Sequence, residues 1–212
     1  MTRALLFDND GVLADTEPLF FEATRAALAS LGVDLSHDHY LELSLRLGRS
    51  CFVLAEERGV GPDEILRARE ARDAHYSELI SAGVPPIDGV RECLEVLAGS
   101  VPMAVVTSST RDFFELIHAR SGLLDFFEFV LASGDYARHK PHPDPYLGAA
   151  ERLGVDPGDC VAVEDTERGL EAATRAGMRC LVVPTALTRG ARFASAHRVL
   201  GSAREIPELL GL

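Results

Sequence analysis

Short apolar runs alternate with longer amphipathic stretches along most of the chain, and this pattern limits the fold more than any other feature. Four amphipathic stretches have helical length, at 88–98, 111–120, 145–153 and 167–176. The strand-length apolar runs lie at Ala4–Phe7, Met103–Val106, Phe129–Leu131, Val161–Val163 and Cys180–Val183. Buried strands that alternate with helices indicate parallel β-α-β units. We therefore predict an α/β fold with a doubly wound, Rossmann-like parallel sheet.

Residues 17–83 have a different character. They are rich in Leu, Ala, Glu and Arg and contain no convincing strand. Glycines and prolines at 32, 48, 59–62 and 83–86 divide this stretch into about four helices. We expect an all-helical cap domain at 17–83, inserted into an α/β core domain made of residues 1–16 and 84–212.

Composition excludes several classes of function. The chain has 212 residues, of which 47% are hydrophobic and 25% charged, as in an ordinary soluble enzyme. The formal charge of −12 argues against a nucleic-acid or anionic-membrane partner. No apolar run approaches the ~20 residues that span a bilayer, and acidic residues follow the start too closely for a secretory signal. We expect a cytoplasmic protein, and nothing in the sequence indicates an obligate dimer.

The cysteines give a further expectation about the cellular compartment. There are four of them, at positions far apart and without C-x-x-C spacing, namely Cys51, Cys93, Cys160 and Cys180. Cys160 and Cys180 abut strand-like runs, so we predict buried, reduced thiols rather than disulfides.

Polar residues follow the predicted strands where each strand ends. The first run leads into Asp8-Asn9-Asp10-Gly11, the second into Thr107-Ser108-Ser109 and the fourth into Glu164-Asp165-Thr166, while Lys140 follows the third run after a short connection. In open parallel sheets, ligands bind beyond the carboxyl ends of the strands. We therefore expect four carboxylates, several hydroxyls and one ammonium to meet at one sheet edge.

This set of charges makes sense with a bound cation. Four carboxylates and one ammonium leave an excess of negative charge, which would repel a phosphate. Mg²⁺ favours a few carboxylates together with water and substrate oxygens. Such an ion would neutralise charge on a transferring group, while Lys140 and backbone amides bind the remaining oxygens.

The same residues resemble a known family. The four motifs of haloacid dehalogenase superfamily phosphatases are similar, in order, to Asp8-x-Asp10-Gly11-Val12-Leu13, Thr107, Lys140-Pro141-x-Pro143-Asp144 and Glu164-Asp165-x-x-x-Gly169. The resemblance covers both ends of the chain and leaves the helical insert where such enzymes carry a small cap. Within the superfamily the chain looks closest to the β-phosphoglucomutase-like sugar-phosphate phosphatases and mutases.

The resemblance implies a role for each matching residue. Asp8 would attack phosphorus and form an aspartyl phosphate, and Asp10 would protonate the leaving alkoxide and then deprotonate the attacking water. Thr107, Ser108 and Lys140 would bind the substrate phosphate. The Mg²⁺ ligands would be Asp8, the main-chain carbonyl of Asp10, Asp165 and Glu164, the last as a direct ligand or as a neighbour of the ligands. The substrate would be a small phosphorylated metabolite, such as a sugar or polyol phosphate.

Two rival functions remain beside a phosphatase. Mutases of the β-phosphoglucomutase kind carry a cap histidine and an arginine where this chain has Phe20 and Cys51, which favours hydrolysis. Glu17, Phe20 and Arg49 are candidate cap residues for specificity, and Arg49 could reach a substrate anion. A non-catalytic phospho-ligand binding protein would be expected to lack one of the chemical residues, yet all of them are present.

Each motif also has an ordinary structural interpretation. Asp8–Gly11 could be a simple turn and Glu164–Thr166 a helix cap, because these residue types favour such positions. Lys140 could be a solvated lysine. Asp144 before Pro145 predicts an N-cap, and Gly154 predicts the end of the same helix.

Overall fold

The computed structural model describes residues 2–211 and contains two compact units. One unit consists of the chain up to Asp15 together with the chain from Val84 onward, and the other consists of Thr16–Gly83. The expected domain boundary after residue 16 thus lies one residue beyond the boundary of the first unit.

The larger unit is built around a six-stranded, all-parallel sheet, which confirms the predicted fold class. Its strand order is β3-β2-β1-β4-β5-β6. The strands span Ala4–Phe7 (β1), Met103–Thr110 (β2), Phe129–Ser133 (β3), Cys160–Glu164 (β4), Arg179–Val182 (β5) and Arg198–Val199 (β6). The pattern of apolar runs did not predict β6, because it consists of two exposed residues at the sheet edge.

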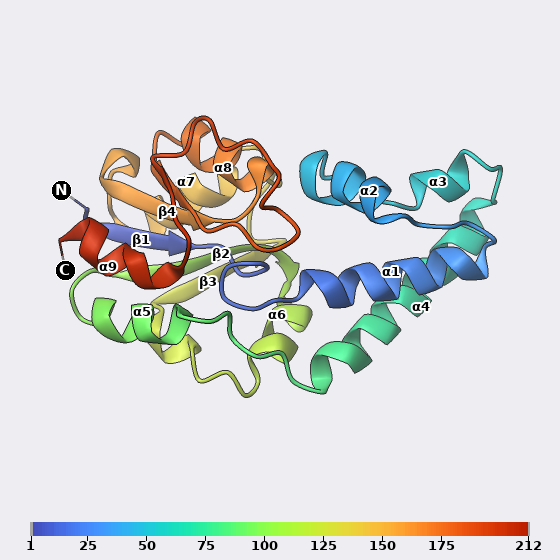
Figure 1. Ribbon diagram of the computed structural model, residues 1–212, viewed down its shortest axis with the longest axis horizontal. Coiled ribbons are helices and arrows are strands. Elements are labelled where there is room, and N and C mark those ends of the chain that lie inside the picture. Colours follow the sequence, from blue (N-terminus) through green and yellow to red (C-terminus); the bar gives the residue numbers. More distant parts are fainter. Residues whose placement is uncertain (1, 212) are drawn as a thin grey trace. The chain divides into compact units, whose positions relative to one another are not determined.

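Helices cover both faces of this sheet (Figure 1). In Figure 1, α7 and α8 lie on the opposite side of β1 from α5. The helices of this unit span Val90–Leu97 (α5), Arg111–His118 (α6), Asp144–Leu153 (α7), Glu167–Arg175 (α8) and Ile206–Leu210 (α9), with 3₁₀ turns at Leu124–Phe126, Pro157–Asp159 and Ala203–Glu205. The sheet is therefore doubly wound, as predicted.

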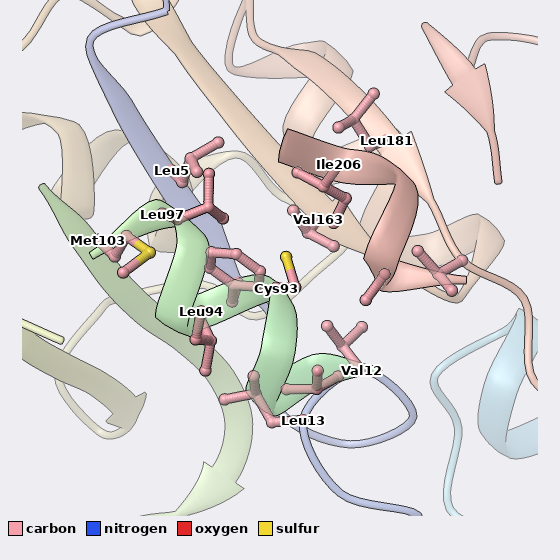
Figure 2. Close-up of a cluster of buried hydrophobic side chains, with 14 of the residues drawn as sticks. Leu5, Val12, Leu13, Cys93, Leu94, Leu97, Met103, Val163, Leu181 and Ile206 are labelled. Atoms are coloured by element: carbon pink, nitrogen blue, oxygen red, sulfur yellow. The ribbon is translucent and has the colours of Figure 1, made fainter. Parts of the chain in front are cut away.

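Alternation along each strand produces two separate cores. Because successive side chains of a strand point to opposite faces, Leu5 and Phe7 enter one core while Leu6 enters the other. The first core includes the apolar stripe of α5, in which Val90 is followed three to four residues later by Cys93 and Leu94, and these in turn by Leu97. Figure 2 labels Cys93, Leu94 and Leu97 in this core. The second core packs the sheet against α7 and α8, through residues such as Tyr146, Ala149, Leu170 and Ala173.

The register of the central strands places three chain segments at one level. Phe7 is paired with Val105 of β2 on one side and with Val163 of β4 on the other. Asp8 therefore leaves the sheet between the ends of β2 and β4. The Thr107 and Glu164 backbones lie close to the same level, so the predicted convergence at this edge follows from the pairing.

The boundaries of α7 require one correction. Asp144 is the first residue of this helix rather than its N-cap, and its carboxylate accepts hydrogen bonds from Arg138 at 3.0 and 2.8 Å. The guanidinium therefore competes successfully for the oxygens that would have capped the helix. Gly154 ends the helix as predicted, in the left-handed conformation at φ 66°.

The smaller unit is helical throughout, with no strand in the described residues 16–83. Helix α1 packs against α4. The elements are Glu17–Ser30 (α1), His37–Tyr40 (α2), a π-helical turn at Leu41–Arg46, Val53–Glu56 (α3) and Pro62–Ser81 (α4). The four cysteines of the chain are free and buried, as predicted. Among residues 2–211, no helix is both long and apolar enough to cross a membrane.

Candidate active site

Asp8 stands at the start of a tight loop beyond β1. Its amide donates to the carbonyl of Val163 over 2.9 Å, which extends the sheet pairing by one residue. The chain then turns at Gly11, whose φ of 79° is a conformation that glycine adopts readily. A Cβ at Gly11 would lie 2.2 Å from Asp165 Oδ2. The segment is a turn, as its composition suggested, but it also brings the β1 and β4 carboxylates together.

Lys140 lies inside this group of carboxylates and is 4% exposed. Its ammonium is 3.0 Å from Asp8 Oδ1 and 2.7 Å from Glu164 Oε1, and it donates to the Val106 carbonyl at 2.9 Å. Burial alone would lower the pKa of Lys140, but the two carboxylates raise it above its usual value. It is also the only lysine in the sequence. The interpretation as a solvated lysine is therefore wrong.

Glu164 is fully buried at the end of β4. Its Oε1 accepts from Lys140 and from the Tyr146 hydroxyl, the latter over 2.6 Å, and its Oε2 lies 3.3 Å from the Asp165 amide. A Cβ at Gly169 would lie 2.0 Å from this carboxylate, so the glycine of the fourth motif makes room for Glu164.

The interpretation of Glu164–Thr166 as a helix cap is correct only for Thr166. Thr166 caps α8 by accepting a hydrogen bond from the Gly169 amide at 3.1 Å. Glu164 and Asp165 are both fully buried and lie before the cap. Their carboxylates are left for the cluster at the sheet edge.

Asp8, Glu164 and Asp165 form a buried acidic cluster, in which one carboxylate oxygen of each lies within 4.8 Å of the others. The pKa of Asp8 is raised to about 8, mainly by burial and also by the charge of Glu164, while Lys140 opposes the shift. One ammonium cannot balance three buried carboxylates. A hard divalent cation with oxygen ligands would, and the donor set fits Mg²⁺. The cluster is a candidate metal site.

Asp10 is held by hydroxyls from the end of β2. Its Oδ2 accepts from Ser109 Oγ at 2.8 Å and from Thr107 Oγ1 at 3.2 Å. The Ser109 amide in turn donates to Thr107 Oγ1 at 3.0 Å. Thr107 was expected to face the phosphate, whereas its hydroxyl here contacts Asp10; Ser108, the other expected phosphate ligand, is half-buried beside it. The Asp10 contact of Ser109 was not predicted, although this serine belongs to the polar run that follows the second apolar stretch.

Two tyrosines at the site were also not predicted. The Tyr136 hydroxyl donates to the Thr107 carbonyl at 2.7 Å, and Tyr146 contacts Glu164 as described above. Tyr136 lies three residues beyond the end of β3, in the connection that leads to Lys140, so reading the residues after strands could have selected it. Tyr146 lies on α7, where that rule does not apply. An aromatic residue in an amphipathic stretch is ordinarily a core residue.

The candidate specificity residues of the cap lie in different surroundings. Glu17 accepts a hydrogen bond from the Tyr40 hydroxyl, and Phe20 packs edge-on against Tyr76 with ring centroids 5.1 Å apart. The Arg72 guanidinium also covers the Phe20 ring, at 4.8 Å from its centroid. Arg49 is exposed. Within this unit Glu17 and Phe20 are therefore tied to neighbouring helices, while Arg49 points to solvent.

The chain is similar to known proteins over most of its length. Residues 5–183 match the family model described as haloacid dehalogenase-like hydrolase. Protein CbbY of Cereibacter sphaeroides is 35% identical over 227 residues, covering 100% of this chain and 97% of that protein. Hexitol phosphatase B of Escherichia coli K12 is 34% identical, covering 98% of this chain and 96% of that one.

Solved structures of similar proteins have the same fold over nearly the whole chain. The crystal structure of CbbY from Rhodobacter sphaeroides in complex with phosphate has a TM-score of 0.81 and 31% identity, covering 97% of this chain and 96% of that chain. A second CbbY structure, a mutant in complex with xylulose-(1,5)bisphosphate, has the same TM-score and 30% identity.

Proposed function

The chain belongs to the haloacid dehalogenase-like hydrolases, and we propose that it is a Mg²⁺-dependent phosphatase that hydrolyses a small sugar or polyol phosphate through an aspartyl phosphate on Asp8. The observation that carries the proposal is the meeting of Asp8, Lys140 and the buried acidic cluster at one sheet edge. Asp10 stands two residues from Asp8, with its carboxylate held by two hydroxyls.

Asp8 acts as the nucleophile. Its carboxylate attacks phosphorus, and the bond from phosphorus to the leaving alkoxide breaks. Lys140 contacts Asp8 Oδ1, so it orients the carboxylate and offers positive charge to the phosphoryl oxygens. Burial of the Lys140 side chain keeps this charge from being screened by water.

Asp10 moves the proton in both halves of the reaction. It donates a proton to the leaving alkoxide, and it then takes one from the water that hydrolyses the aspartyl phosphate. The hydrogen bonds from Ser109 and Thr107 to Oδ2 hold the carboxyl group in a fixed direction. The family's dehalogenases need no such acid, because a halide leaves without protonation.

We propose that Mg²⁺ is held by Asp8, Asp165 and the main-chain carbonyl of Asp10. When bound, the ion would neutralise the carboxylates and charge on the transferring group. The family resemblance allows Glu164 to be either a direct ligand or a neighbour of the ligands. Because its Oε1 already accepts from Lys140 and Tyr146, we assign it the role of holding Lys140 in place.

Two features support a sugar or polyol phosphate as substrate and hydrolysis as the outcome. A relative is named a hexitol phosphatase, and a similar CbbY crystal structure holds a sugar bisphosphate. The cap positions at which mutases carry histidine and arginine hold Phe20 and the buried Cys51. Neither residue supplies a charge for a second phosphate.

The proposal is tested with hexitol phosphates, fructose 1-phosphate, a ketose bisphosphate and β-glucose 1-phosphate, each with and without Mg²⁺. Phosphorus NMR follows the products, and glucose 1-phosphate is given a bisphosphate activator. We expect release of inorganic phosphate from at least one substrate. Conversion of glucose 1-phosphate to the 6-phosphate with little free phosphate would identify a mutase. Saturable binding without turnover of any substrate would identify a binding protein.

A further inference from the structure

His118, the last residue of α6, reaches the loop that carries both proposed catalytic aspartates. Its Nε2 lies 2.6 Å from Asn9 Oδ1, between two residues separated by 109 positions in the chain. His118 is 4% exposed and Asn9 is fully buried. Asn9 stands between Asp8 and Asp10, so the imidazole holds the residue that connects the nucleophile to the acid.

Asn9 fixes the loop through its backbone as well. Its amide donates to Asp8 Oδ1 at 2.8 Å. Its carbonyl accepts from the amides of Val12, Leu13 and Ala14, at 3.1, 2.8 and 3.2 Å. A rotation of Asn9 would therefore disturb the Asp8 carboxylate and the turn together. Within residues 2–211, its side-chain nitrogen Nδ2 has no hydrogen-bond partner, which leaves the side chain dependent on the His118 contact.

The surroundings of His118 select one tautomer. The Ser121 hydroxyl lies 2.9 Å from His118 Nδ1, and Ser121 Oγ accepts from the Leu123 amide at 3.1 Å. The same hydroxyl also lies 3.3 Å from the His118 carbonyl oxygen. Asn9 Oδ1 can only accept a hydrogen bond, so the ring proton lies on Nε2 and is donated to it, while Nδ1 is left as an acceptor for the Ser121 hydroxyl. Burial lowers the pKa of His118 to about 4, so the ring stays neutral near neutral pH. The Phe114 ring, with its centroid 4.6 Å away, packs against the imidazole.

We infer that His118 is a positioning residue for catalysis, which donates from Nε2 to Asn9 and thereby sets the directions of Asp8 and Asp10. The inference rests on the proposed function for its kinetic consequence. The structural consequence, that the His118–Asn9 hydrogen bond keeps residues 8–14 rigid, holds whether or not the protein is a phosphatase.

The test compares His118→Leu, which cannot donate, with His118→Gln, whose amide can reach the same oxygen. His197→Gln serves as a matched control, because His197 is an exposed histidine outside the site. Hydrogen exchange at Val12, Leu13 and Ala14 is measured first. We expect His118→Leu to exchange faster by about tenfold or more and His118→Gln to stay near wild type. Equal exchange in all variants would overturn the inference, whether or not the wild type is a phosphatase.

Turnover of an aryl phosphate with Mg²⁺ is measured second. We expect His118→Leu to lower kcat by about 10-fold to 100-fold with KM changed less than about threefold, and His118→Gln to recover most of the loss. Asn9→Ala breaks the same bond from the other side, and it replaces His118→Leu if that variant does not fold. In the double variant that combines His118→Leu with Asn9→Ala, the loss of kcat should be smaller than the product of the losses in the two single variants. Multiplying losses, or no recovery by glutamine, would contradict the inference, while an inactive wild type would contradict only the proposed function.

Discussion

The ammonium of Lys140 lies 3.0 Å from Asp8 Oδ1, and the two side chains are only 2% and 11% exposed. This contact links the connection that follows β3 to the end of the central strand. It places the only lysine of the chain directly on the proposed nucleophile. The Lys140 ammonium and the Asp8 carboxylate contact each other in a buried place. We therefore expect a substitution of Lys140 and a substitution of Asp8 each to lower activity strongly, with different effects on stability.

Replacing Lys140 with methionine should lower both activity and stability. The variant leaves Asp8 and Glu164 buried without their cation, so we expect a loss of about 3–5 kcal/mol in the free energy of unfolding. Loss of the positive charge at the phosphoryl group should lower kcat by about 10²–10³-fold. Urea unfolding and steady-state kinetics measure the two effects. Arg120→Met removes an exposed cation and is the control; a kcat of Lys140→Met close to that of this control would remove Lys140 from the mechanism.

Asp8→Asn should abolish turnover without harming the fold. An amide is a poor nucleophile and a weak metal ligand, so no aspartyl phosphate can form. Because burial raises the pKa of Asp8 to about 8, the charged carboxylate is unfavourable in the metal-free protein. The neutral amide should therefore leave the metal-free thermal midpoint unchanged or higher. Calorimetry in chelator and a phosphate-release assay check both points. Wild-type turnover by a sample proven free of deamidation would exclude Asp8 as nucleophile.

Activity should require Mg²⁺ and be lost in Ca²⁺. Calcium is larger and takes more ligands, often bidentate carboxylates, so it would hold both Asp8 oxygens and prevent attack. We expect chelator to remove phosphate release, Mg²⁺ to restore it, and Ca²⁺ to fail or inhibit. The measurement is turnover of one substrate in a titration of each ion. Full activity in excess chelator would show that the buried acidic cluster works without a cation.

The parallel core could be predicted because buried strands must be apolar on both faces. Runs such as Val161–Val163 are therefore visible in the sequence, and the residues that follow them are placed at one edge by parallel pairing alone. Asp8, Asp10 and Glu164 were found in this way. The two-residue strand β6 was not, because Val199 beside Arg198 is a single exposed apolar residue and not an apolar run of strand length.

The residues that support the site could not be predicted from the same rule. His118 and Tyr146 lie on helices, and their contacts with Asn9 and Glu164 join positions 109 and 18 residues apart. In the sequence, a histidine that contacts the site from an amphipathic helix cannot be distinguished from a histidine elsewhere on such a helix. Only the packing of α6 and α7 on opposite faces of the sheet decides which helical residues reach the strand ends.

Acid should destabilise the wild type more than a variant without the His118 imidazole. Burial lowers the pKa of His118 from its usual 6.5 to about 4 in the folded protein. Below pH 6.5 the unfolded chain therefore binds a proton at His118 that the folded protein does not bind. The free energy of unfolding falls as the pH is lowered from 6.5 to about 4. The full stabilisation is present above pH 6.5.

This loss amounts to about 3 kcal/mol between neutral pH and pH 4. His118→Gln has no group that titrates there, so the difference in unfolding free energy between wild type and variant should shift by about that amount in favour of the variant as pH falls. Other titrating groups act equally on both proteins and cancel. Urea unfolding at a series of pH values measures the shift, and His197→Gln should follow the wild type throughout because its side chain is exposed. A constant difference between wild type and His118→Gln would mean that the imidazole is protonated as easily in the folded protein as in the unfolded chain.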